Sequence, residues 1–173
     1  MFFLLTANLA LAAKKPAAPV GPPCLADTTA ALAEAGPASA GKAWLEVANC
    51  DADGARAAAP EAWQKIISGP GADAAAVKAL ELGLGGAVRT WVDTLQPDEK
   101  SHFISTIGDQ CANDAVPTFF SDSAAALGDK FWSGRWYAGL SGCRAPSAVA
   151  LLEGGLESQH GDRSRFKAIL ETR

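Results

Sequence analysis

Residues 97–116 read PDEKSHFISTIGDQCANDAV and carry the signals of a helix, a turn and the start of a second helix. Pro97 suits the first turn of a helix, where its missing N–H costs nothing. Asp98 and Glu99 add negative charge to the same turn, where the helix dipole favours it. The apolar residues that follow keep the helical period: Phe103, Ile104, Ile107 and Cys111. This stretch therefore predicts two short helices joined by a turn.

The same pattern recurs along the chain, which makes an internal repeat the first hypothesis to test. Four aligned positions end the first helix of each unit, at intervals of 33, 28 and 32 residues: Cys50, Gly83, Cys111 and Cys143. Five residues after each of them lies a small or branched apolar residue near the start of a second helix: Ala55, Val88, Val116 and Ala148. A unit of two helices and a turn fits this period.

Further helical signals lie on both sides of the opening stretch. Two more apolar stripes keep the helical period: Val88, Trp91, Val92 and Leu95, and Ala148, Val149, Leu152, Gly155 and Leu156. Pro60, Pro117 and Pro146 are expected in first turns, and Asp73 is expected to be an N-cap. Together these signals predict about ten short helices.

Composition supports an all-α fold in one domain. The chain has 173 residues, of which 49% are hydrophobic, with many alanines and few β-branched residues. Alanine favours helices, whereas β-branched residues favour strands. The net charge is -4 and no long run of one charge occurs, so the usual electrostatic support for nucleic-acid binding is missing.

The repeat resembles the HEAT-like family, especially the short subclass of bilin-lyase-like proteins. Three stretches carry the resemblance, within residues 44–156: Ile107-Gly108 followed by Asp114-Ala115-Val116-Pro117, Leu140 followed by residues 146–152, and Ala87-Val88-Arg89. The resemblance implies a right-handed α-α superhelix of stacked helices. It does not imply lyase activity, because no signature of a bilin site is present. The period is also shorter than the roughly 40 to 47 residues usual for HEAT units.

The N-terminal segment resembles a secretory signal. An apolar run from Phe2 to Leu11 overlaps a small-x-small pattern at Ala10-Leu11-Ala12, although no basic residue precedes the run. The run is too short to span a membrane, which takes about 20 residues. We therefore expect a signal peptide at 1–13, a Pro- and Ala-rich tether at 14–23 and a helical-repeat domain at 24–173. These segments predict a periplasmic or secreted location. The alternative is a cytoplasmic protein with an apolar N-terminal tail.

Four cysteines in an exported chain most often form two disulfides, with three possible pairings. Cys111 and Cys143 occupy the same position in adjacent units, so their helices should lie side by side. This leaves Cys24 to pair with Cys50. A zinc site is the alternative, but the sequence has no CxxC motif and both histidines lie far from any cysteine. We expect no metal and no cofactor.

Two short motifs resemble parts of functional sites, a calcium loop and a catalytic helix, but neither motif is complete. The series Asn49, Asp51, Asp53 and Gly54 matches the start of a calcium loop, but the twelfth position is Pro60 rather than a bidentate glutamate. A turn between helices is the favoured interpretation. Glu157-Ser158 resembles the end of the catalytic helix of lytic transglycosylases. Only fifteen residues follow Ser158, which is too little chain for the substrate-binding elements of such an enzyme.

An aromatic run lies near the C-terminal end. Trp132, Trp136, Leu140 and Cys143 keep the helical period, so core packing is the first interpretation. Arg135, Trp136 and Tyr137 are the candidate binding residues, because these residue types are favoured at interaction hot spots.

The functional hypothesis is an exported helical-repeat scaffold of the bacterial cell envelope that binds another envelope protein. Repeat stacks offer broad interaction surfaces, and no GxSxG, P-loop or GxGxxG motif occurs. We expect no catalytic activity. The alternatives are an enzyme that acts on the cell wall and a structural envelope component.

Overall fold

The computed structural model describes residues 26–133, 136–143 and 145–157, and these residues are helical without a strand. The elements are α1 (Ala26–Glu34), α2 (Pro37–Cys50), α3 (Ala52–Lys65), α4 (Pro70–Glu81), α5 (Gly85–Thr94), α6 (Pro97–Gly108), α7 (Ala115–Leu127), α8 (Asp129–Ser133), α9 (Trp136–Gly139), the 3-10 turn η1 (Leu140–Gly142) and α10 (Pro146–Glu157). The all-α prediction is therefore confirmed. The predicted signal peptide at 1–13 and tether at 14–23 lie outside the described residues.

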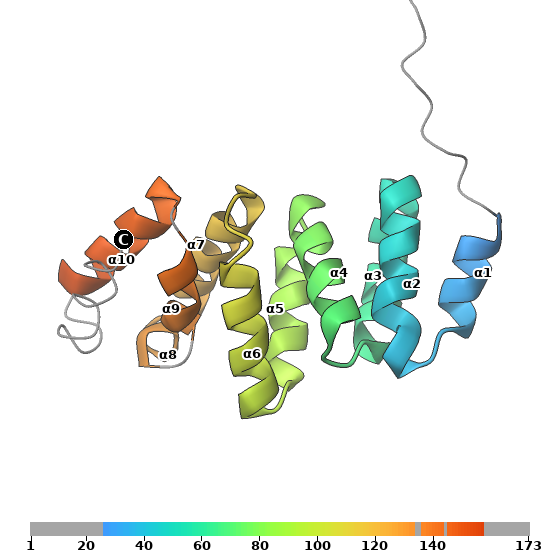
Figure 1. Cartoon of the computed structure of the whole chain (residues 1–173), viewed down its shortest axis with the longest axis horizontal. Coiled ribbons are helices and arrows are strands. Elements are labelled where there is room, and N and C mark those ends of the chain that lie inside the picture. Colours follow the sequence, from blue (N-terminus) through green and yellow to red (C-terminus); the bar gives the residue numbers. More distant parts are fainter. Residues whose placement is uncertain (1–25, 134–135, 144, 158–173) are drawn as a thin grey trace, which may run out of the picture.

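The helices follow one another in chain order along the longest axis of the molecule, from α1 at one end to α10 at the other (Figure 1). In one layer α2 packs on α4, α4 on α6, and α6 on α9. In the layer behind it, α3 packs on α5 and α7 packs on α10. Consecutive helices such as α2 and α3 also pack on each other, so the layers share one hydrophobic core.

The second helix of each pair begins where the repeat alignment places it. The four aligned apolar residues lie in the first turns of α3, α5, α7 and α10, and each is 0% exposed: Ala55, Val88, Val116 and Ala148. The spacing of apolar residues therefore located equivalent core positions in four successive pairs.

Two predicted helix starts are wrong. Pro60 lies inside α3, which begins after Asp51, whose carboxylate accepts a hydrogen bond from the Gly54 N–H at 2.9 Å. The alanines around Pro60 favour the helix strongly enough to continue it past the missing N–H. Asp73 lies in the first turn of α4 and is not its N-cap, because Pro70 at the first position starts the helix earlier.

The start of α6 agrees with the sequence. Pro97 occupies its first turn together with Asp98 and Glu99. The Glu99 carboxylate accepts hydrogen bonds from the Ser68 hydroxyl and from the Gln96 N–H, the latter at 3.0 Å. These bonds, with that from Ser68 the stronger influence, hold the pKa of Glu99 below its usual range. Since Ser68 lies between α3 and α4, the contact also ties α6 to the preceding pairs.

A ladder of aromatic rings runs through the core between successive helix pairs. Edge-to-face contacts join Trp44 of α2 to Trp63 of α3 at 5.6 Å between ring centroids, and Trp63 to Trp91 of α5 at 5.4 Å. Trp91 in turn contacts Phe103 of α6 at 5.0 Å. This geometry suits aromatic pairs, and each ring is almost completely buried. We call these four residues the aromatic ladder.

The three indole N–H groups of the ladder differ in their hydrogen bonds. Trp44 Nε1 donates to the Ala55 carbonyl at 3.0 Å, and Trp91 Nε1 donates to the Ile66 carbonyl at 2.8 Å. Trp63 Nε1 is buried and has no acceptor. The outer indoles therefore also fix the backbone beside them, whereas the central indole acts through packing alone.

Pairs of glycines let helices of the front layer approach closely. A Cβ atom on Gly41 of α2 would lie 3.0 Å from the carbonyl carbon of Gly71 in α4. A Cβ atom on Gly108 of α6 would overlap the carbonyl of Gly139 in α9. Both contacts join helix backbones directly, so a larger residue there would force the helices apart.

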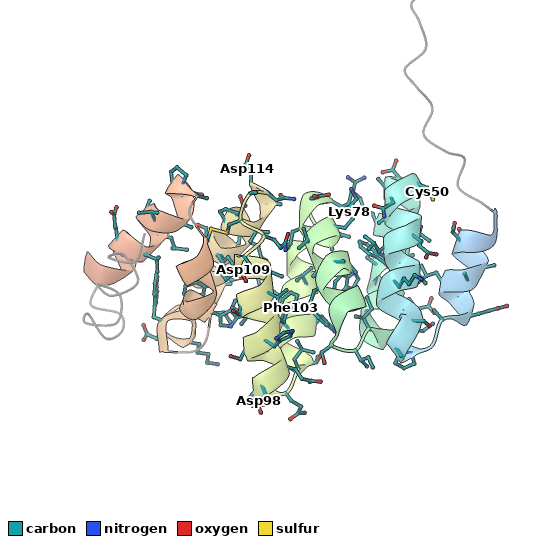
Figure 2. The ribbon with its side chains drawn as sticks, viewed as in Figure 1. Cys50, Lys78, Asp98, Phe103, Asp109 and Asp114 are labelled. Carbon is teal, nitrogen blue, oxygen red and sulfur yellow. A yellow bond between two sulfur atoms is a disulfide. The ribbon has the colours of Figure 1, made fainter. Side chains whose placement is uncertain are left out.

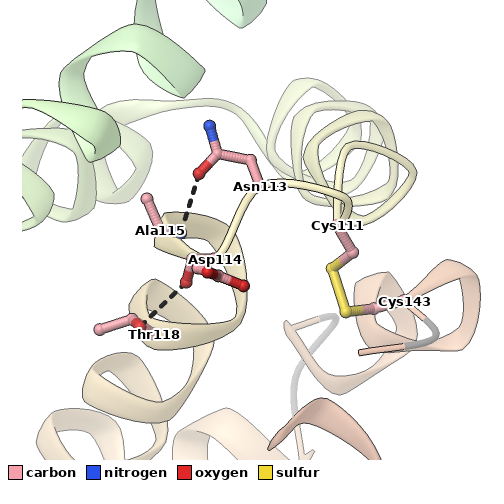
Figure 3. The surroundings of a disulfide bond; sticks show 6 residues. All are labelled: Cys111, Asn113, Asp114, Ala115, Thr118 and Cys143. Carbon is pink, nitrogen blue, oxygen red and sulfur yellow. Dashed lines mark hydrogen bonds between the residues drawn. A yellow bond between two sulfur atoms is a disulfide. The ribbon is translucent and has the colours of Figure 1, made fainter. Parts of the chain in front are cut away.

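The predicted Cys111–Cys143 disulfide is present, with 5.1 Å between the Cα atoms (Figure 3). It joins the turn after α6 to the residue that follows η1. In the same turn Asn113 Oδ1 accepts a hydrogen bond from the Ala115 N–H at 2.9 Å, which helps to start α7. Cys50 is also disulfide-bonded. Its predicted partner, Cys24, lies outside the described residues.

Replacing both Cys111 and Cys143 by alanine should lower the free energy of unfolding by about 3–4 kcal/mol, because the unfolded chain regains the freedom of a loop of this length. The sequence separation of the two cysteines is 32. Urea titration of the oxidised wild type and variant measures the difference. A loss below about 1 kcal/mol would show that the bond does not restrain the unfolded chain as this model requires.

The hydrogen bonds of the ladder predict a difference between two equivalent truncations. Trp91→Phe leaves the Ile66 carbonyl without its donor, whereas Trp63→Phe removes an N–H that has no acceptor. We therefore expect Trp91→Phe to destabilise the fold by about 1–2 kcal/mol more than Trp63→Phe. Chemical denaturation of both variants tests this, and equal losses would contradict it.

Candidate functional site

A groove of about 600 Å³ crosses the front layer of the molecule. It lies between α2, α4 and the C-terminal end of α6. Its lining residues are Leu45, Asn49, Asp73, Ala74, Val77, Lys78, Glu81, Thr106, Ile107 and Gln110. We call it the α2–α4–α6 groove. It is the candidate functional site because it combines an apolar surface with several polar groups.

The position of the groove follows from how α2 and α4 pack. The two helices touch through Gly41 and Gly71, close to their N-terminal ends. Leu45 and Asn49 follow Gly41 at steps of one helical turn, so they share its side of α2. The α4 residues that line the groove lie beyond Gly71 in the same direction. Side chains farther along the two helices therefore form the walls.

The surface of the groove is partly apolar. Ile107 is 0% exposed, Leu45 and Val77 are half-buried, and Ala74 is exposed. A side chain resting on this surface would remove apolar area from water, the main favourable contribution to association.

One end of the groove is polar and already paired. Lys78 Nζ lies 2.9 Å from a Glu81 carboxylate oxygen, and the Asn113 amide donates to the other Glu81 oxygen at 2.6 Å. Lys78 lies toward the edge of the stack where Cys50 and Asp114 also lie (Figure 2). The charges of Lys78 and Glu81 compensate each other. These side chains therefore help to fix α4 against the turn that follows α6.

Unlike Lys78 and Glu81, the groove residue Asp73 forms no ion pair with another described side chain. Its carboxylate is half-buried, and burial raises its pKa above the usual range, while the nearby His102 lowers it by a smaller amount. Among the described residues, none donates a hydrogen bond to this carboxylate. A carboxylate that loses water without gaining a donor costs stability. Such a group in a cleft is a candidate for function.

Two side-chain amides lie on opposite walls of the groove. Asn49 is near the end of α2 and Gln110 follows α6, and both are exposed. Each directly precedes a disulfide-bonded cysteine, Cys50 and Cys111 respectively. An amide offers both donors and an acceptor, which match the N–H and C=O groups of a peptide backbone. The walls therefore carry exposed groups that can both donate and accept hydrogen bonds.

The structure does not place the predicted binding residues at this site. Trp136 is only 3% exposed and packs against Phe119, with 5.7 Å between the ring centroids. Lys100 Nζ lies 5.4 Å from the centroid of the Trp136 ring. Trp136 belongs to the core, so its burial does not favour the predicted binding role, which stays a prediction. Arg135 and the side chain of Tyr137 lie outside what the structure describes. The sequence analysis missed the groove residues. A mixture of apolar and polar residues on one helix does not show which other helices pack beside it.

The other motifs also serve the fold where the structure describes them. Asp51 caps α3, and Asp53 forms an ion pair with Arg56 at 2.6 Å, as expected of a turn between helices. Within the described ranges, no group of three or more His, Cys, Asp or Glu residues is arranged to hold a metal ion. Glu157 ends α10, but its side chain and Ser158 lie outside the described residues.

Comparisons with known proteins give no assignment. No protein-family model, no curated protein and no solved structure matches this chain. The groove and the chemistry of its residues are therefore the features that bear on function.

Asp73→Asn should raise the melting temperature at neutral pH. A carboxyl group whose pKa is higher in the folded than in the unfolded state destabilises the fold once it is ionised. This cost is complete above the raised folded pKa and vanishes below the unfolded value. The gain should therefore fade as the pH falls through the range just above the ordinary value of 3.8. Thermal melts across this range measure it.

Asp122→Asn is the matched control for that change, because Asp122 is an exposed carboxylate on α7 and its loss alters the net charge equally. Its melting temperature should stay close to that of the wild type. If Asp73→Asn instead lowers the melting temperature at neutral pH, the ionised Asp73 stabilises the fold and the argument fails.

Proposed function

We propose that this chain is an exported helical-repeat scaffold that binds another protein of the bacterial cell envelope. The α2–α4–α6 groove carries the proposal, because it offers an apolar surface with peptide-like hydrogen-bonding groups on opposite walls. Among the described lining residues, no nucleophile is paired with a base, so binding without catalysis is the function that the groove supports best.

We propose further that the helix pairs are HEAT-like units wound into a right-handed α-α superhelix. Support comes from the equivalent positions of Ala55, Val88, Val116 and Ala148, all completely buried in successive pairs. In an array of this kind each unit buries its apolar face against its neighbours. The front layer then forms one continuous surface, of which the groove is a part.

A periplasmic or secreted location is part of the proposal. The Cys111–Cys143 disulfide supports it, because structural disulfides persist in oxidising compartments. Among the helices that the structure describes, none has the length and apolar character needed to cross a membrane. The net charge of -4 favours a protein partner over nucleic acid.

Crosslinking in intact cells, followed by mass spectrometry, tests the proposal. The wild type should retain a defined envelope protein, with crosslinks near the groove. Ala74→Arg should reduce this retention at least severalfold, because it places a long charged side chain at an exposed position of the groove. Ala57→Arg makes the same change at an exposed position of α3 that does not line the groove, and should have no effect.

Other results would support the two alternatives. Crosslinks to further copies of the chain alone would indicate a structural envelope component. Cleavage of purified cell wall that is abolished by Glu157→Gln would indicate an enzyme. Equal retention of the partner by Ala74→Arg and Ala57→Arg would place the binding surface elsewhere on the molecule.

A further inference from the structure

The charges of the groove do not cancel. Lys78 and Glu81 form an ion pair, so they contribute little net charge between them. Asp73 then remains as the charged lining residue without such a partner. The apolar part of the groove is therefore next to a carboxylate that forms no ion pair among the described side chains, although His102 lies near it.

The carboxylate and the apolar surface are adjacent. Asp73 and Val77 are four residues apart on α4, so their side chains lie on the same face about one turn, roughly 5.4 Å, apart. Leu45 contributes from the α2 wall, whereas Ile107 of α6 lies beneath the surface with no exposed area. A ligand that rests on Val77 and Leu45 would therefore also reach Asp73.

We propose that the groove recognises a polypeptide segment of its partner that carries a lysine or arginine beside an apolar side chain. The basic group pairs with Asp73, and the apolar side chain rests on Leu45 and Val77. This inference depends on the proposed function, and it adds the chemistry of the partner. A charged donor then replaces the hydrogen bonds from water that the half-buried carboxylate lost on folding.

Other ligand classes fit this chemistry less well. A phosphate or another anion would be repelled by Asp73. A calcium ion needs six to eight oxygen ligands, and the described residues provide no such cluster. A neutral apolar segment would bury Asp73 further without a partner, which is costly for a charged group. A basic side chain is the ligand group that compensates the buried charge.

Selection from a library of random peptides tests the proposal with the full-length, oxidised protein. Peptides selected by the wild type should be enriched in lysine or arginine next to an apolar residue. Affinity of a selected peptide should fall about tenfold for Asp73→Asn, because one charged hydrogen bond is lost. Asp122→Asn should bind it as the wild type does. Ala74→Arg should prevent binding.

The outcomes separate this inference from the proposed function. Loss of binding in Ala74→Arg would show that the selected peptides occupy the groove. If those peptides are not enriched in basic residues, or if they bind Asp73→Asn as tightly as the wild type, the assignment of a basic partner is overturned. The groove would then remain a binding site. If Ala74→Arg binds every selected peptide as the wild type does, the peptides do not bind in the groove and the proposal of a basic segment fails, whereas the crosslinking in cells still tests the scaffold. Tighter binding of a synthetic peptide of residues 14–23, which contains Lys14 and Lys15, would make the chain's own tether the occupant and overturn the assignment to a partner.

Discussion

The edge-to-face contacts of the aromatic ladder are the interaction on which the rest of the structure depends. Trp44, Trp63, Trp91 and Phe103 come from four helices in three successive pairs, and the residues around them are mostly alanines. Small side chains bring helices close together but bury little area each. The large rings therefore supply much of the apolar burial and link one pair to the next. Within the front layer, the glycine contacts between α2 and α4 and between α6 and α9 set how closely the helices approach.

The sequence predicted those features that depend on local periodicity. The apolar stripe of α6, the first-turn charges of Asp98 and Glu99, and the buried start of each second helix all follow from spacing along one helix. The Cys111–Cys143 bond was predicted for a related reason, because equivalent positions in adjacent units come close together. The helical period of Trp132, Trp136, Leu140 and Cys143 also predicted core packing, and these side chains are buried. The residue types alone suggested a binding surface instead.

The groove could not be predicted because it depends on distances between helices. Its residues come from α2, α4 and α6, and its place depends on the contact between Gly41 and Gly71. A sequence shows that Asp73 lies near apolar residues, but not that burial removes its water without supplying a donor. The errors at Pro60 and Asp73 have a different, local origin, since neighbouring alanines and Pro70 determined where those helices run.

The placement of the cysteines has a consequence for when the groove is completed. Asn49 and Gln110 stand on opposite walls, and the next residue in each case is held by a disulfide. The bond from Cys111 ties the Gln110 wall to Cys143, and Cys50 on the α2 wall is also disulfide-bonded. A newly made chain in a reducing environment has neither bond. If the groove binds a partner as proposed, both covalent restraints beside its amides are in place only after oxidation.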